Sequence, residues 1–180
     1  RCNLSCQGCW VTPHNPPREL SLQQLDGIVN ACRARGVRFF GLLGGEPLLH
    51  PHLFELLRRH PDCYFQLFTN GTLLDAEAAC ELRKAGNATP LVSIEGDAVV
   101  SDTRRGGENV YARSLAALEH CRRERLITGV ASSVCRSNLE TVASDAFLQS
   151  LEALGVLYAW YYIYRPVGPR PCPELALADE

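Results

Sequence analysis

The 180-residue sequence has no methionine, one lysine among 18 basic residues, and no apolar run near the roughly 20 residues of a membrane-spanning helix. The formal net charge is −2, so no excess of basic residues indicates binding to nucleic acid or to a membrane surface. The first residues do not have the pattern of a signal peptide. Because no initiating methionine is present, we expect residues 1–180 to be one domain excerpted from a longer protein, truncated at both ends.

The sequence has nine cysteines, so they cannot all be joined in pairs as disulfides. A small secreted protein held together by disulfides usually has an even number in a shorter chain. We therefore expect a reducing, cytoplasmic environment. Six cysteines are expected to be buried as small hydrophobic side chains, several of them on helices. These six are Cys32, Cys63, Cys80, Cys121, Cys135 and Cys172.

The other three cysteines form a compact set, Cys2-x3-Cys6-x2-Cys9, with no fourth cysteine nearby. Four protein ligands would complete a zinc or iron–sulfur site. Three thiolates around a four-iron cluster leave one iron open, and an open iron can bind and activate a small molecule. A zinc site completed by a distant His14 or His50 remains an alternative, with a structural or electron-transfer role.

Hydrophobic periodicity predicts alternating helices and strands. The first helix begins at a Ser21-x-x-Gln24 capping box and ends at Gly36. Further helices are predicted at residues 51–60, 75–85, 109–125 and 138–154, and strands at 37–43, 64–68, 91–94, 128–135 and 156–164. Residues 12–18 and 165–173 are rich in proline, and residues 97–107 are polar, so all three segments are predicted as loops.

This alternation predicts an α/β fold with a parallel sheet and helices outside it, because the strands are too apolar to face water. A curved, partly closed β/α barrel fits the number of elements. Its first strand is expected just before Cys2 and is largely missing. A flat doubly wound sheet is the alternative.

Three short motifs follow predicted strands, and parallel β/α folds build their sites at the carboxyl ends of strands. Each motif alone is also compatible with an ordinary turn. The motifs are Gly44-Gly45-Glu46-Pro47, Thr69-Asn70-Gly71, and Ser93-Ile94-Glu95-Gly96 followed by Asp102-x-x-Arg105.

The cysteine set followed by Gly44-Gly45-Glu46-Pro47 resembles the radical S-adenosylmethionine (SAM) superfamily, and the later motifs resemble its SPASM-type branch. The resemblance implies a partial (β/α)6 barrel, with residues 1–180 as the core domain. It also implies an enzyme with a [4Fe–4S] cluster on Cys2, Cys6 and Cys9. In this family the open iron binds SAM, which is cleaved reductively to a 5′-deoxyadenosyl radical that abstracts hydrogen from a substrate.

The same resemblance implies the remaining site residues. Gly44, Gly45 and Glu46 would bind the amino group of SAM, and Asn70 would lie close to the cofactor. Ser93 and Arg105 would contact the ribose and the carboxylate, within one cavity shared with Glu46 and three converging cysteine sulfurs. The adjacent Arg104 is expected to turn away. The sequence departs from the branch at Glu95, where an aspartate is usual.

The implied partners are a peptide or small-molecule substrate and an external electron donor of the flavodoxin or ferredoxin type, without nucleic acid or membrane. Two other functions remain open at this stage. One is the iron–sulfur or zinc protein described above. The other is a phosphate-binding β/α enzyme that uses Gly44-Gly45 as a phosphate loop, although no P-loop lysine accompanies it.

Overall fold

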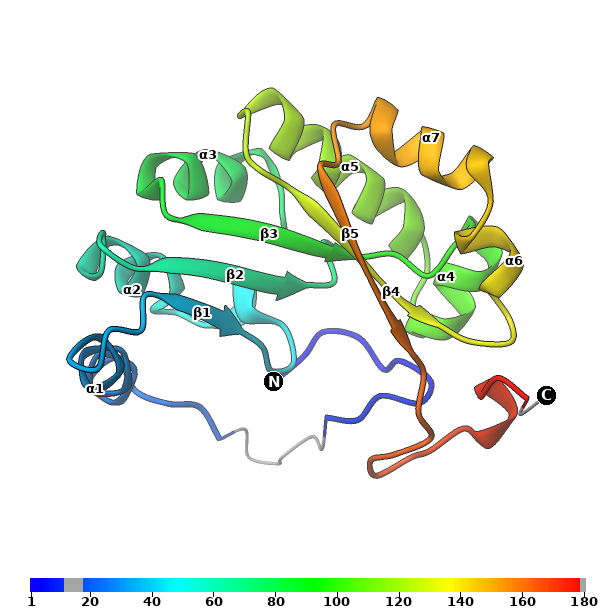
Figure 1. Ribbon diagram of the computed structural model, residues 1–180, viewed down its shortest axis with the longest axis horizontal. Coiled ribbons are helices and arrows are strands. Elements are labelled where there is room, and N and C mark those ends of the chain that lie inside the picture. Colours follow the sequence, from blue (N-terminus) through cyan, green and yellow to red (C-terminus); the bar gives the residue numbers. More distant parts are fainter. Residues whose placement is uncertain (12–17, 179–180) are drawn as a thin grey trace.

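The computed structural model, which describes residues 1–11 and 18–178, contains a parallel sheet of five strands in chain order (Figure 1). Apart from Arg18, the predicted loop at 12–18, including His14, lies outside the described residues. The strands are β1 (Phe39–Leu42), β2 (Tyr64–Thr69), β3 (Ala88–Ser93), β4 (Gly129–Val134) and β5 (Tyr158–Ile163). Because each strand pairs only with its sequence neighbours, the order does not reverse as it would in a doubly wound sheet.

The sheet is curled: side chains of β2 and β5 meet although β3 and β4 lie between these strands. Gln66 donates a hydrogen bond from Nε2 to the Tyr158 hydroxyl at 3.1 Å. The rings of Phe68 and Trp160 pack edge to face with centroids 5.4 Å apart. These contacts span the concave face, so the predicted partial barrel is confirmed as an open half-barrel.

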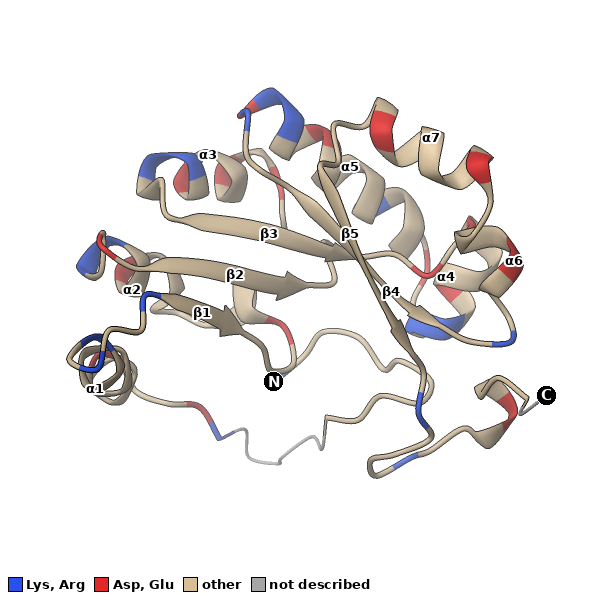
Figure 2. Ribbon diagram, viewed as in Figure 1, with Lys and Arg blue, Asp and Glu red and all other residues tan. Residues whose placement is uncertain are grey.

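Helices cover the convex face, and most charged residues lie on the helices and loops while the strands carry none (Figure 2). Ser21 caps the first helix with the predicted capping box, since its hydroxyl accepts from Gln24 N while its own N donates to the Gln24 side chain. The helices are α1 (Leu22–Arg33), α2 (Leu53–Arg59), α3 (Ala76–Ala85), α4 (Ala98–Arg105), α5 (Val110–Arg123), α6 (Leu139–Val142) and α7 (Asp145–Ala153). Short 3-10 turns are η1 (Pro47–Leu49) and η2 (Pro173–Leu175).

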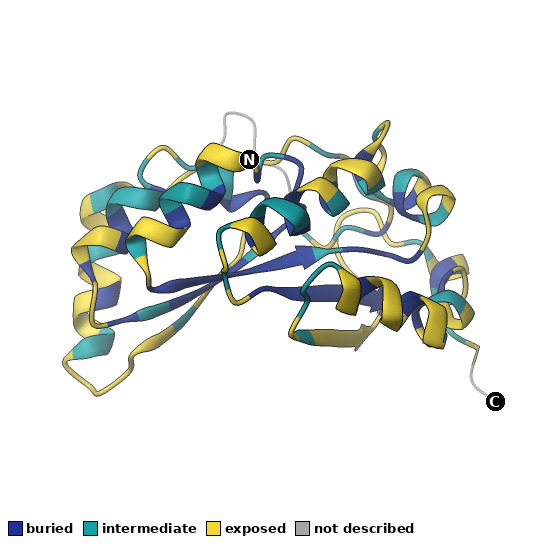
Figure 3. Cartoon of the chain, turned by 90° about the horizontal axis from the view of Figure 1, so that it is seen from above, coloured by how far each residue is buried: buried dark blue, intermediate teal, exposed yellow. Residues whose placement is uncertain are grey.

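The main core lies between the helices and the central strands, which are the most buried part of the chain (Figure 3). Phe65 and Leu67 of β2, Val92 of β3 and Val130 of β4 are at most 1% exposed. Burial of each such side chain contributes about 1.5–3 kcal/mol, so these strands form a firm support for the loops at their carboxyl ends.

The predicted loop at 97–107 is wrong, because residues Ala98–Arg105 form helix α4. Asp97 caps its first turn by accepting from Val100 N, and Gly106 ends it with a positive φ of 63°. The capping signals were therefore present in the sequence. The helix escaped the periodicity analysis because its only buried residues are the polar Ser101 and Arg104.

Two further expectations fail in detail. The helix predicted at 138–154 is divided into α6 and α7, because Ser144 caps a new helix by accepting from Phe147 N. The expectation that all strands are shielded from water is wrong for both edge strands, since Phe39 of β1 is 58% exposed and Trp160 of β5 is 47% exposed. Of the six cysteines expected to be buried, Cys63, Cys121 and Cys135 are buried, whereas Cys32, Cys80 and Cys172 are only half-buried. Cys32 and Cys80 lie on α1 and α3, which bury only one face against the sheet.

Candidate cofactor site

The cysteine loop, residues 1–10, runs along the carboxyl ends of the strands (Figure 1). On the β1 side, Glu46 N donates to Arg1 O at 3.0 Å. A Cβ on Gly45 would collide with the carbonyl of Arg1 and lie 2.9 Å from Cys2 Cβ. Gly45 is therefore needed because the two backbones approach each other closely.

The other end of the cysteine loop rests against the end of α4. Gln7 N donates to Arg104 O at 2.7 Å, and a Cβ on Gly106 would lie 2.5 Å from Ser5 O. The loop is thus fixed from two sides by backbone contacts, and α4, which the sequence analysis missed, supplies one of them.

The three loop cysteines are free thiols; Cys2 is exposed, and Cys6 and Cys9 are half-buried. Burial raises the pKa of the Cys6 thiol, the positive charge of Arg105 lowers it, and Cys9 and Cys2 raise it further. No three Cys, His, Asp or Glu side chains among the described residues are grouped closely enough to hold a metal ion. The three sulfurs that were expected to converge are therefore not grouped at the spacing of a metal site in this structure.

Glu46 is buried, at 3% exposure, and connects the ends of β1 and β2. Its Oε1 accepts from Thr69 Oγ1 at 2.7 Å and from Leu48 N at 3.1 Å, and its Oε2 accepts from Asn70 N at 2.8 Å. Burial raises the pKa of this carboxyl, and the hydrogen bonds from Asn70, Thr69 and Leu48 act against that rise. The carboxylate thus has a structural role within the protein in addition to the predicted contact with SAM.

Asn70 belongs to a network that reaches the cysteine loop. Its Nδ2 donates to Asn3 Oδ1 at 2.9 Å and lies 4.0 Å from Cys2 Sγ. Asn3 Nδ2 in turn donates to Thr72 Oγ1 at 2.8 Å. The sequence analysis did not select Asn3 or Thr72; the only signal was an amide side chain beside Cys2.

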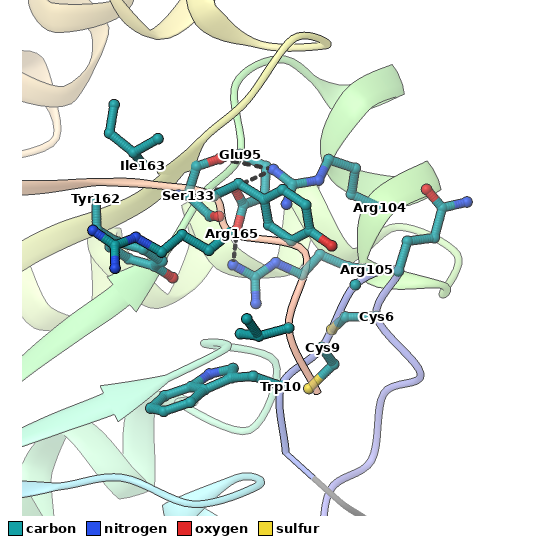
Figure 4. A pocket seen from close by; sticks show the side chains of 14 residues that line it. Cys6, Cys9, Trp10, Glu95, Arg104, Arg105, Ser133, Tyr162, Ile163 and Arg165 are labelled. Atoms are coloured by element: carbon teal, nitrogen blue, oxygen red, sulfur yellow. Dashed lines mark hydrogen bonds and ion pairs between the residues drawn. The ribbon is translucent and has the colours of Figure 1, made fainter. Parts of the chain in front are cut away.

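Glu95 is a buried carboxylate that pairs with two consecutive arginines (Figure 4). Arg104 Nη1 donates to Glu95 Oε2 at 2.8 Å and to Ser133 O at 2.9 Å, and Arg105 Nη2 donates to Glu95 Oε1. The expectation that Arg104 turns away is wrong, because both side chains reach the same carboxylate from the last turn of α4. Burial disfavours the charged guanidinium of Arg105, but Glu95, together with smaller contributions from Cys6 and Tyr162, raises the pKa of Arg105.

A cavity of about 300 Å³ adjoins this group (Figure 4). Its walls contain Cys6 and Cys9 beside Arg104 and Arg105, so it has excess positive charge next to two thiols. Among the described residues, this lining does not include the other predicted site residues. Those are Cys2, Gly44, Gly45, Glu46, Asn70 and Ser93.

Of the predicted site residues, Cys6, Cys9 and Arg105 line this cavity. Glu46 and Asn70 belong to the network at the ends of β1 and β2. Ser93 shares the concave face of β3 with Thr89, because alternate residues of a strand point to the same side.

The structure also bears on the zinc alternative. His50 Nε2 lies 3.0 Å from Leu20 O. His50 thus has a backbone partner at the start of α1. His14 lies outside the described residues.

Comparison with known proteins decides the family, since residues 1–136 match the family model described as "Radical SAM superfamily". The chain belongs to the radical SAM superfamily. An AdoMet-dependent heme synthase of Methanosarcina barkeri (strain Fusaro / DSM 804) is 33% identical to it over 172 residues, covering 93% of this chain and 49% of the relative. The chain thus spans about half the length of this curated relative.

Two solved structures show the same fold as this radical SAM chain. Streptococcus suis SuiB bound to its precursor peptide SuiA superimposes with a TM-score of 0.77 at 16% identity, covering 91% of this chain and 37% of SuiB. The anSMEcpe structure with bound AdoMet, which is SAM, and the Kp18Cys peptide gives a TM-score of 0.75 at 21% identity, covering 92% and 49%. The family uses a [4Fe–4S] cluster and SAM, which confirms the predicted cofactors.

The residues of the cysteine loop fit these cofactors in their chemistry. Three free thiols are suitable ligands for iron. The adjoining cavity is lined by three arginines, Arg104, Arg105 and Arg165, and by one carboxylate, Glu95, and guanidinium groups bind carboxylates well. No helix of the described residues is long and apolar enough to span a membrane.

Proposed function

We propose that this radical SAM chain is the core of an enzyme whose [4Fe–4S] cluster is bound by Cys2, Cys6 and Cys9. The observation that supports this proposal most directly is the shared cavity, in which two of the three thiols lie beside the buried Arg104 and the half-buried Arg105. When bound, the cluster supplies the electron for reductive cleavage of SAM, and the resulting radical abstracts hydrogen from the substrate.

The chain's own residues bind and orient SAM in this proposal. Arg105, with a side chain 13% exposed, offers a fixed positive charge for the SAM carboxylate. Glu46 accepts from the amino group, and the glycines of Gly44-Gly45 leave room for that group beside the backbone. Asn70 and Ser93 supply polar atoms on the side of the ribose. Because the arginines are held by Glu95 beforehand, they need little rearrangement when an anion binds.

The proposed substrate is a peptide or a small metabolite. The peptide complexes of SuiB and anSMEcpe support a peptide, whereas the heme synthase supports a small molecule. Reductive cleavage requires one external electron, so we also propose a donor of the flavodoxin or ferredoxin type.

Anaerobic reconstitution with iron and sulfide tests this function. We expect a four-iron absorption and EPR spectrum that changes on addition of SAM, and release of methionine and 5′-deoxyadenosine under reducing conditions. Cys6→Ala should lose both the cluster and the products, whereas Cys80→Ala on α3 should retain them as a matched control. Full cluster content in Cys6→Ala would contradict the assignment. Stoichiometric zinc with no response to SAM would favour the zinc alternative.

A further inference from the structure

Gly8, the residue before the third cysteine, lies against the ring of Tyr164 at the end of β5. Gly8 has a positive φ of 66°, and a Cβ added there would lie 2.7 Å from two ring carbons of Tyr164 and would also collide with its hydroxyl. The tyrosine ring therefore occupies the space that a side chain at position 8 would need. This contact joins residues 156 positions apart in the chain, so no local sequence pattern predicts it.

Tyr164 is itself held firmly. It is 6% exposed, its N donates to Val134 O at 2.8 Å, and its hydroxyl accepts from Cys172 N at 3.1 Å. The Arg104 guanidinium lies 5.8 Å from the centroid of its ring, within the range of a cation–π contact. With Cys135 and Leu175 it forms a small core of its own, separate from the main one. A ring fixed in this way can determine the position of the loop that rests on it.

The segment that follows β5, residues 164–175, touches the cysteine loop at a second point. A Cβ on Gly168 would lie 2.7 Å from Trp10 Cα and 3.1 Å from Cys9 O. The segment thus contacts both neighbours of Cys9, Gly8 on one side and Trp10 on the other. The β1 side of the loop, by contrast, is fixed near Cys2 by Gly45. The position of the third cysteine therefore depends on the far end of the sheet.

We propose that Tyr164 is a positioning residue for the cluster, because its ring, seated on Gly8, fixes the backbone next to Cys9. The role belongs to the ring rather than to the hydroxyl, since the ring carbons fill the space beside Gly8. This inference rests on the proposed function, in which Cys9 is a ligand. It assigns no contact with SAM or substrate to Tyr164.

Iron retention in the reconstituted full chain tests the proposal. Tyr164→Ala should lose iron to a chelator roughly tenfold faster than the wild-type protein, a typical effect of removing a side chain that supports a metal ligand. Tyr164→Phe keeps the ring and should stay close to the wild-type rate. Tyr161→Ala is the matched control: it removes a tyrosine of β5, three residues before Tyr164, whose hydroxyl donates to Val142 O in α6. Tyr161→Ala should lose iron at the wild-type rate.

A double-mutant cycle between positions 8 and 164 tests the contact without metal. Gly8→Ala should lower the thermal midpoint of the metal-free chain and speed alkylation of Cys9 by iodoacetamide. Much of this effect should vanish in the Tyr164→Ala background, where the clash is removed. The strain of the left-handed backbone at position 8 remains in both backgrounds. If Tyr164→Ala fails to fold, Gly8→Ala replaces it in the iron measurement and should also lose iron faster.

The outcomes separate this inference from the proposed function. A wild-type protein that takes up no cluster overturns both. A wild-type protein with a cluster, together with equal iron loss in Tyr164→Ala and Tyr161→Ala, overturns only the positioning role. The positioning role is also overturned if Gly8→Ala and Tyr164→Ala have additive effects on the thermal midpoint and on alkylation of Cys9.

Discussion

Glu46 has two separable roles at the scale of single residues, one within the fold and one proposed toward SAM. Its carboxylate accepts hydrogen bonds from Thr69, Asn70 and Leu48. Glu46→Ala should therefore lower the free energy of unfolding of the metal-free chain by at least about 1–3 kcal/mol, because buried donors lose their acceptor.

The same variant should weaken SAM binding by roughly tenfold to a hundredfold, the effect of losing a charge-assisted hydrogen bond. Urea unfolding measures the first effect, and titration of the reconstituted protein with SAM measures the second. An unchanged SAM dissociation constant alongside reduced stability would leave Glu46 with the structural role alone.

Glu95 gives a second test at this scale, because it is the only carboxylate that Arg104 and Arg105 pair with among the described residues. Glu95→Ala should destabilise the chain by about 3–5 kcal/mol, since it leaves buried guanidinium charge uncompensated. Arg105→Ala should lower the free energy of unfolding by less, because Glu95 keeps its ion pair with Arg104. Urea unfolding measures both free energies of unfolding. An equal decrease in Glu95→Ala and Arg105→Ala would contradict this account of Glu95 and its two arginines.

At the scale of elements, α1 and α2 are joined by Asp26 and His60, whose Oδ1 and Nε2 lie 2.9 Å apart. The hydrogen bond from His60, and then that from Arg59, lowers the pKa of Asp26 against the opposing effect of burial. A carboxyl with a lowered pKa in the folded state contributes stability above its unfolded pKa of about 3.9, and this contribution is lost as the pH falls through the folded pKa.

Asp26→Asn should therefore lower the thermal midpoint at neutral pH, and the difference from the wild-type protein should shrink as the pH falls below about 4. Differential scanning fluorimetry across pH 2–7 measures this difference. Glu152→Gln on α7 is a suitable control, because Glu152 is exposed and forms no ion pair within the described residues. A constant difference across the whole pH range would show that Asp26 acts through packing rather than charge.

At the scale of the whole molecule, the open half-barrel brings the cysteine loop, α4 and the segment after β5 together at one edge of the sheet. SAM bound at that edge should stabilise the folded state. At a concentration a hundredfold above its dissociation constant, it should add about 2.7 kcal/mol, or roughly 5–10 °C in the thermal midpoint. Thermal melts of the reconstituted protein with and without SAM measure the shift. The same shift in Cys6→Ala would show that SAM binds without the cluster.

The sequence by itself determined the alternation of elements and the motifs at the strand ends, because both are local patterns. Apolar runs of strand length predicted a parallel sheet, and Cys2, Cys6 and Cys9 lie close together along the chain whatever the fold. The predicted helix boundaries were wrong where local signals competed. Polar α4 has no apolar stripe, and Ser144 begins a new helix inside a continuous apolar pattern.

Only the tertiary structure decided which side chains meet. The sequence motif favoured Arg105 over its neighbour Arg104, but both reach Glu95 because it is buried beside the last turn of α4. Asn3 reaches Thr72, and Tyr164 reaches Gly8, across long stretches of chain. These contacts depend on how far the sheet curls and where its edge places each loop. That curvature arises from the packing of all the strands and helices together, and no single segment of the sequence encodes it.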